Sequence, residues 1–151
     1  MGLMQGLHFD ELTEGMCFRS PSVTVTEDAI IRFAMEWDPQ PFHVDRNAAA
    51  QSIFGTLVGS GLQTLLMTYR LYYQIGLLQG TALAGLGMDD VRFLAPLKPG
   101  DTIAVDCRVE ALRPTRRDER GVVGLSLSTS DHAGSLLLTM TLTALVARRP
   151  G

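Results

Sequence analysis

One segment, Leu62 to Leu78, constrains the fold more than any other part of the chain. It is the longest apolar stretch, and as an α-helix its 17 residues would span about 25 Å. Its apolar side chains occur nearly all round the helix, which is typical of a helix that is buried on most sides. The sequence therefore predicts a central helix that the rest of the chain must cover.

The chain downstream of this helix has the period-two alternation of half-buried β-strands. Apolar and polar side chains alternate in three segments, which are Thr102 to Ala111, Val123 to Ser130 and Leu136 to Val146. The turns between these segments are short, so we expect an antiparallel meander. Two further strands are expected, a glycine-rich one from Thr81 to Phe93 and a short or bent one from Met16 to Val25, where Pro21 cannot donate to the ladder.

A meander of half-buried strands leaves one apolar face that another element must cover. The helix that begins at Leu62 is the only predicted element long and apolar enough to cover it. The sequence therefore predicts an α+β hot-dog fold, in which an antiparallel sheet wraps around a long central helix. We expect one such domain over residues 1–151.

Charge and composition exclude several classes of protein. Thirteen Lys and Arg against sixteen Asp and Glu give a net charge of −3, which argues against a general nucleic-acid binder. No run reaches the roughly 18 apolar residues of a membrane-spanning helix, and Met1 to Asp10 lacks the basic start and apolar run of a signal peptide. Two cysteines are too few for a disulfide framework, and no metal-ligand spacing is present. We expect a cytoplasmic protein with no metal site and no nucleic-acid or membrane partner.

Two prolines separate a carboxylate from an imidazole upstream of the central helix. Thr26 is expected to cap a helix that Pro39 and Pro41 end, and these prolines are expected to hold the following residues extended. Asp38 and His43, which are five positions apart, are thereby held at a rigid spacing. An acid–base pair needs such rigidity because its two side chains must converge on one substrate atom. Spacing alone leaves a plainer alternative open, in which Asp38 flanks the helix end and His43 packs in the interior.

A glycine-containing loop, Phe54 to Gly61, leads directly into the central helix. Backbone N–H groups at a helix N-terminus, unshielded by side chains at Gly59 and Gly61, suit a developing oxyanion. The alternative is that Ser60 is an ordinary N-cap and that the glycines form a tight turn.

These residues carry a resemblance to a known family. The segment Asp38-Pro39-Gln40-Pro41-Phe42-His43, followed by the glycine loop, resembles the hydratase motif of the MaoC-like dehydratases. This is a hot-dog family that includes the (R)-specific enoyl-CoA hydratases. Arg92 to Asp101 is similar to the strand and turn that follow the central helix in that family.

The resemblance implies reversible addition of water to a 2-enoyl thioester, which gives a 3-hydroxyacyl thioester. In that reading Asp38 and His43 are the catalytic acid–base pair, and the N–H of Gly61 donates to the thioester carbonyl. The residues expected to contact the substrate are Ser60, Gly59 and Phe42. The resemblance also implies an acyl-CoA or acyl-carrier-protein substrate, no further cofactor, and at least a homodimer with pockets at its interface.

The sequence departs from the family pattern at the predicted site. Ser60 stands where many hydratases have His, and Gln40 stands where Asn is frequent. Tyr69 occupies the position of a serine that supports the site in some relatives, and Thr68 beside it could replace that serine only with a shift in helix register. Asp45 is a second candidate acid, although it is expected to be the N-cap of a short helix through Ala50.

Two other functions remain open at this stage. One is a thioesterase on the same fold, and the other is a non-catalytic subunit that binds acyl thioesters or stabilises a partner. Four arginines crowd one predicted turn and either contact coenzyme A phosphates or, as is commoner, form a charged hairpin tip; they are Arg113, Arg116, Arg117 and Arg120.

Overall fold

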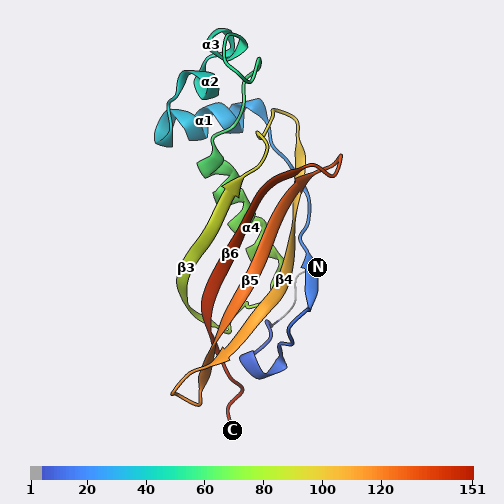
Figure 1. The fold of residues 1–151 in the computed structure, drawn as a ribbon, viewed down its shortest axis with the longest axis vertical. Coiled ribbons are helices and arrows are strands. Elements are labelled where there is room, and N and C mark those ends of the chain that lie inside the picture. Colours follow the sequence, from blue (N-terminus) through green and yellow to red (C-terminus); the bar gives the residue numbers. More distant parts are fainter. Residues whose placement is uncertain (1–4) are drawn as a thin grey trace.

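A strongly curved antiparallel sheet and one long helix make up most of the structure, which is a computed structural model that describes residues 5–151 (Figure 1). The first four residues of the segment searched for a signal peptide lie outside the described residues. The elements in chain order are the 3-10 helix η1 (Phe9–Glu11), strands β1 (Cys17–Arg19) and β2 (Val23–Thr24), helices α1 (Glu27–Trp37), α2 (Pro41–Val44), α3 (Arg46–Ala50) and α4 (Gly61–Ile75), and strands β3 (Ala82–Phe93), β4 (Thr102–Pro114), β5 (Arg120–Asp131) and β6 (Leu136–Ala147).

The strands lie in the order β1-β4-β5-β6-β3, and β2 also pairs with β4. Every pairing is antiparallel, and β4, β5 and β6 form the predicted meander. The expected bent strand is present as β1 and β2, on either side of Pro21. β3 pairs with β6 at the far edge of the sheet, a placement that the sequence pattern did not indicate.

α4 lies across the concave face of the sheet, as Figure 1 shows. Its inward side chains include Leu71 and Tyr72, which join a core made largely of alternate side chains from β4, β5 and β6. Val109, Leu125 and Leu138 of that core are completely buried. Burial of these apolar surfaces is the main stabilising contribution, and it confirms the predicted sheet around a central helix.

The prediction that the central helix is buried on most sides is wrong for α4 in a single chain. The helix has an exposed apolar stripe formed by Leu62, Leu66, Tyr69 and Tyr73, and Leu66 is 55% exposed. The sheet curves around only one side of the helix, so an apolar residue on the opposite side has no cover within the chain. α4 is also shorter than predicted, because Gly76 adopts a left-handed conformation (φ 80°) that ends it.

A β-bulge in β4 corrects a second expectation. The period-two alternation over Thr102 to Ala111 predicts Ala111 on the same apolar face as Val109, but Ala111 is exposed. The register shifts between these two residues, which pair with consecutive residues of β5, so Glu110 is an extra residue in β4. An extra residue reverses the alternation of faces beyond it, and Leu112 is the next side chain that packs on the core.

Helices α1, α2 and α3 gather at one end of the molecule, above the N-terminus of α4 (Figure 1). Thr26 caps α1 as predicted, because its hydroxyl accepts a hydrogen bond from the Ala29 N–H. The residues after Pro41 are helical rather than extended, since Pro41 occupies the first turn of α2, where its missing N–H costs nothing. Gln40, which precedes this proline, is extended.

The helices in residues 5–151 are all too short or too polar to cross a membrane.

A buried hydroxyl pair joins α4 to the sheet and generates a stability prediction. Thr68 donates to the Thr64 carbonyl (2.7 Å) and accepts from Thr129 of β5 (2.5 Å), and both threonines are fully buried. Replacing Thr68 by Val leaves the Thr129 hydroxyl without an acceptor, which should lower the free energy of unfolding by about 1–3 kcal/mol. The double variant Thr68→Val/Thr129→Val should lose less than the sum of the single variants. Urea unfolding followed by circular dichroism measures all three; strictly additive losses would contradict the pair.

Candidate active site

Asp38 and His43 converge at the end of the molecule that carries the short helices. Asp38 ends α1, where its N–H donates to the Ala34 carbonyl, and His43 lies in α2. The distance from Asp38 Oδ2 to His43 Nε2 is 3.4 Å, and the two side chains are only 18% and 7% exposed. Both interpretations of this segment are therefore correct in part. Asp38 flanks a helix end and His43 is buried, and the two side chains also lie next to each other as an acid–base pair would.

A backbone carbonyl fixes the tautomer of His43. The Nδ1 atom lies 2.6 Å from the carbonyl oxygen of Val58. A carbonyl oxygen can only accept a hydrogen bond, so Nδ1 carries the hydrogen. In the neutral ring, Nε2 then carries a lone pair, and this lone pair faces the Asp38 carboxylate.

Both carboxylate oxygens of Asp38 accept hydrogen bonds from side chains. The Ser60 hydroxyl donates to Oδ2 at 2.6 Å, and the Gln40 amide donates to Oδ1 at 2.9 Å. These two bonds, Ser60 first, hold the pKa of Asp38 below its ordinary value against the opposing effect of partial burial, and His43 adds a smaller lowering when its ring is protonated. Because the pKa is lowered on folding, ionised Asp38 stabilises the fold above the pKa of an exposed Asp, and this contribution is lost as the pH falls through the lowered pKa.

The two departures from the family pattern, Ser60 and Gln40, are thus the two partners of the carboxylate. Sequence reasoning placed Ser60 against the substrate and did not connect it with Asp38, which is 22 positions away. Neither Thr68 nor Tyr69 acts as the supporting serine that some relatives have at the position of Tyr69. Thr68 is bonded to Thr129 in the core, and Tyr69 lies on the exposed stripe of α4.

The two N–H groups of the glycine loop that were expected to be free donors, those of Gly59 and Gly61, differ in the structure. The N–H of Gly59 donates to the Leu97 carbonyl at 2.7 Å, so the expectation that this group is free is wrong. Gly61 is the first residue of α4, and the N–H at that position has no acceptor within its helix. The Ser60 hydroxyl caps α4 through the Leu62 N–H (3.2 Å), as the alternative interpretation expected.

Both glycines lie in close contact with side chains from the end of β3 and the loop after it. A Cβ atom at Gly61 would lie 2.8 Å from the ring of Phe93, and one at Gly59 would lie 3.0 Å from Leu97 Cδ2. The end of β3 and the loop after it therefore press directly against the start of α4, and a side chain at Gly61 would require Phe93 to move.

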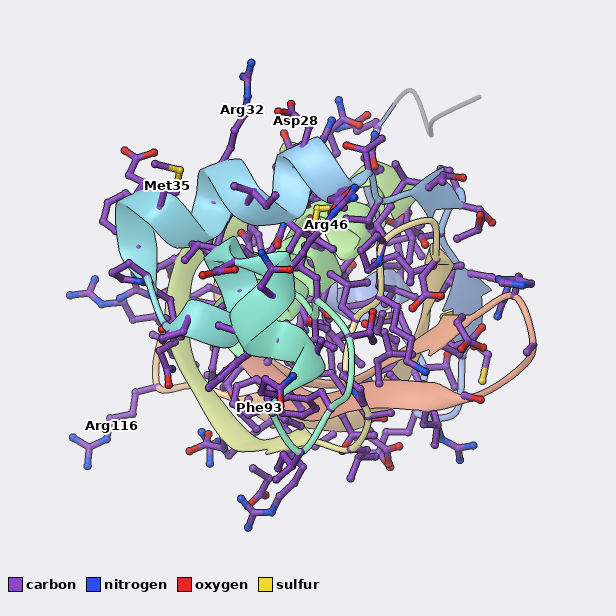
Figure 2. All side chains as sticks on the ribbon, turned by 90° about the horizontal axis from the view of Figure 1, so that it is seen from above. Asp28, Arg32, Met35, Arg46, Phe93 and Arg116 are labelled. Carbon is purple, nitrogen blue, oxygen red and sulfur yellow. The ribbon has the colours of Figure 1, made fainter. Side chains whose placement is uncertain are left out.

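A pocket of about 450 Å³ opens beside these groups. Its polar end contains the Asp38 and His43 side chains and the backbone at Gly61, and most of the remaining wall is apolar. The apolar lining comes from three separated parts of the chain and comprises Phe42, Phe54, Val58, Leu62, Phe93, Leu94, Ala95, Pro96 and Leu97. Figure 2, which looks down on α1 to α3, labels Phe93 beside the short helices. Of the expected substrate contacts, Ser60, Gly59 and Phe42 all line the pocket.

Sequence reasoning missed Phe93 and Leu97 as parts of this pocket. They lie more than thirty positions beyond the glycine loop, and nothing in their local pattern distinguishes them from other strand and turn residues. Their contacts with Gly61 and Gly59 depend on where β3 ends relative to α4.

Other candidate groups lie outside the pocket. Asp45 is the N-cap of α3, as expected, and accepts from the N–H groups of Asn47 and Ala48. The β4–β5 hairpin with its arginines is at the opposite end of the sheet from α1 to α3 (Figure 1), and Arg116 projects away from the body (Figure 2). Within this chain the cluster is therefore a charged hairpin tip. Residues 5–151 contain no cluster of three or more His, Cys, Asp and Glu side chains suited to hold a metal ion.

Comparisons with known proteins agree with this architecture. The chain is 32% identical to YdeM of Bacillus subtilis (strain 168) over 142 residues, which are 94% of this chain and all of YdeM. It is 36% identical over 114 residues to the protein MaoC of Klebsiella aerogenes, but it spans only 33% of that protein. It is also 37% identical over 87 residues to the 3-hydroxyacyl-thioester dehydratase Z of Mycobacterium tuberculosis (strain H37Rv), covering 56% of this chain and 58% of that one.

Solved structures show the same fold. The MaoC-like dehydratase from Rhodospirillum rubrum superposes with a TM-score of 0.90 at 36% identity, covering 97% of this chain and all of that one. The Mycobacterium tuberculosis protein RV0216, described as a double hotdog fold, superposes with a TM-score of 0.79 at 22% identity, covering 96% of this chain and 45% of that one. The predicted hot-dog fold is confirmed.

The sequence model of the "MaoC like domain" matches residues 10–130, a range that includes the Asp38–His43 pair, the glycine loop, α4 and the first strands of the meander. This chain belongs to the MaoC-like dehydratase family.

Proposed function

We propose that this protein catalyses the reversible addition of water to a 2-enoyl-CoA, which gives a 3-hydroxyacyl-CoA. The observation that carries the proposal is the approach of two hydrogen-bond acceptors, Asp38 Oδ2 and His43 Nε2, to 3.4 Å at the polar end of an apolar pocket. Membership of a family that includes proteins named as dehydratases supports it.

Two acceptors at this separation suit one water molecule. The carboxylate is ionised because its pKa is lowered, and the neutral imidazole presents a lone pair at Nε2. A water molecule has two hydrogens, so it can donate one to each acceptor and turn an oxygen lone pair toward the pocket. The pair thereby binds and orients the nucleophile.

In the proposed hydration, the water oxygen bonds to the β-carbon of the enoyl group while His43 Nε2 takes one water proton. The electrons of the double bond move onto the thioester as an enolate. His43 then returns its proton to the α-carbon. Asp38 stays ionised and stabilises the imidazolium, since its two donors disfavour its protonation, and imidazole is suited to accept and return a proton near neutral pH.

The enolate oxygen is assigned to the N-terminus of α4. The Gly61 N–H and the positive end of the helix dipole favour negative charge at this position. The apolar wall with Phe42 and Phe93 suits the acyl chain. The thioester carbonyl itself accepts the electrons, so the proposed reaction uses no cofactor beyond the substrate's own coenzyme A.

The test measures loss of enoyl absorbance with crotonyl-CoA and a longer enoyl-CoA. Asp38→Asn and His43→Ala should each lower kcat/KM by at least about a hundredfold, because each removes one of the two groups that orient the water and move its proton. Matched controls are Asp28→Asn, at the exposed start of the same helix (Figure 2), and His132→Ala, in the exposed β5–β6 turn; both should retain wild-type activity.

A free-thiol assay run in parallel separates the alternative reactions. Release of thiol without loss of the double bond would show a thioesterase. Binding of crotonyl-CoA by calorimetry without turnover of either acyl group would indicate a non-catalytic subunit, and either result would overturn the proposal.

We also propose that two copies of the chain pair through α4 and β3. β3 is an edge strand of twelve residues with one side unpaired, and exposed apolar side chains occur both along it and along the α4 stripe. An open edge and an uncovered apolar stripe together favour self-association. Leu62 and Phe93 belong to this surface and also line the pocket, so a partner would complete one wall of the site.

Light scattering after gel filtration tests the pairing. The wild type should have at least twice the mass of one chain, and Leu66→Glu should shift the population toward the monomer, because it places a charge in the stripe. Met35→Glu is the control, since Met35 is 69% exposed on the outer side of α1 (Figure 2). A monomeric wild type, or equal effects of the two variants, would contradict the predicted surface.

A further inference from the structure

The Ser60 hydroxyl joins two parts of the site that the sequence keeps apart. Its oxygen accepts from the Leu62 N–H and caps α4, and its hydrogen goes to Asp38 Oδ2, at 3.2 and 2.6 Å. We propose that Ser60 is a positioning residue, which orients the Asp38 carboxylate and fixes it relative to the N-terminus of α4. This inference rests on the hydration proposed above and deepens it.

The hydrogen-bond inventory of a hydroxyl group makes these two roles compatible. A serine hydroxyl has one hydrogen to donate and two lone pairs to accept. The cap uses a lone pair and leaves the hydrogen for the carboxylate. An O–H···O⁻ bond of 2.6 Å is charge-assisted and is among the stronger hydrogen bonds in proteins. Ser60 is completely buried, so water does not compete for this contact.

The carboxylate has few other constraints. Asp38 is the C-cap of α1, with φ −156° and ψ 71°, and lies outside the regular helix. Its second donor, Gln40, is an exposed residue whose bond to Oδ1 water can replace. Ser60 is therefore the buried donor that selects the orientation of Asp38, and it binds the same oxygen that faces His43 Nε2.

The substrate gives a chemical reason for this arrangement. In each planar conformer of a conjugated 2-enoyl thioester, the β-carbon and the carbonyl oxygen are held at a fixed separation. The groups that place the water and the N–H that receives the oxygen must therefore also be held at a fixed separation. The next residue after Ser60 is Gly61, the assigned oxyanion donor. One side chain thus ties both halves of the site together.

Kinetics give the first test. Ser60→Ala should lower kcat with crotonyl-CoA by about 10- to 100-fold, with little change in KM, because the pocket wall is preserved while the carboxylate loses its orientation. Ser60→Thr keeps the hydroxyl and should restore most of kcat. Thr26→Ala is the matched control, since it removes the cap of α1 in the same way but does not touch Asp38; it should keep the wild-type kcat.

A titration of the substrate-free protein gives a second test that needs no catalytic activity. Carboxyl carbon NMR, with the Asp38 signal identified by its absence in Asp38→Asn, reports the pKa of Asp38. Ser60→Ala should raise this pKa relative to the wild type, because the principal donor that lowers it is removed. Thr26→Ala should leave it unchanged.

The two tests separate failure of this inference from failure of the proposed function. An unchanged pKa of Asp38 in Ser60→Ala would overturn the positioning role, and so would a folded Ser60→Thr whose pKa matches that of Ser60→Ala. A raised pKa together with absence of turnover in the wild type would overturn the hydratase proposal and retain the contact of Ser60 with Asp38. Should Ser60→Thr not fold, the Ser60→Ala titration decides.

Discussion

The packing of α4 against the concave face of the sheet is the constraint on which the rest of the structure depends. Burial of Leu71 and Tyr72 against β4, β5 and β6 fixes the axis and rotation of the helix. Its N-terminus is thereby held at the end of the sheet where α1 and α2 lie (Figure 1). Glycine at positions 59 and 61 allows the end of β3 and the loop after it to approach this N-terminus closely. A rigid core thus positions a site that is built mostly from helix ends and loops.

The electrostatics of the site come from hydrogen bonds rather than from deep burial. Two side-chain donors lower the pKa of Asp38 and keep it ionised beside His43. The Val58 carbonyl determines which imidazole nitrogen carries the hydrogen, so that the other nitrogen faces the carboxylate. One end of the apolar pocket thus holds an ionised carboxylate beside an imidazole whose Nδ1 hydrogen is already bonded to a backbone carbonyl.

Several features of the fold could be predicted directly from residue patterns. Alternation of side chains located β4, β5 and β6, and Thr26 and Asp45 were correctly predicted as helix caps. Other predictions failed where a single residue changed the local geometry. Glu110 forms a bulge that turns Ala111 outward, and Pro41 begins a short helix although the prolines were expected to keep the chain extended. Periodicity describes a regular element, and it carries no signal for an inserted residue or for the choice between a turn and one helical turn.

At the site, the sequence by itself determined the chemical inventory and much of the local geometry. The prolines between Asp38 and His43 and the glycines before α4 are local features, and local features can be read from spacing. Only the tertiary structure decided that the Ser60 hydroxyl donates to Asp38, that the Gly59 N–H is bonded to the Leu97 carbonyl, and that the Phe93 ring packs against Gly61. The physical reason is that these contacts join residues from different elements. Their distances depend on how α4 is rotated and where β3 ends, and the packing of the whole core sets both.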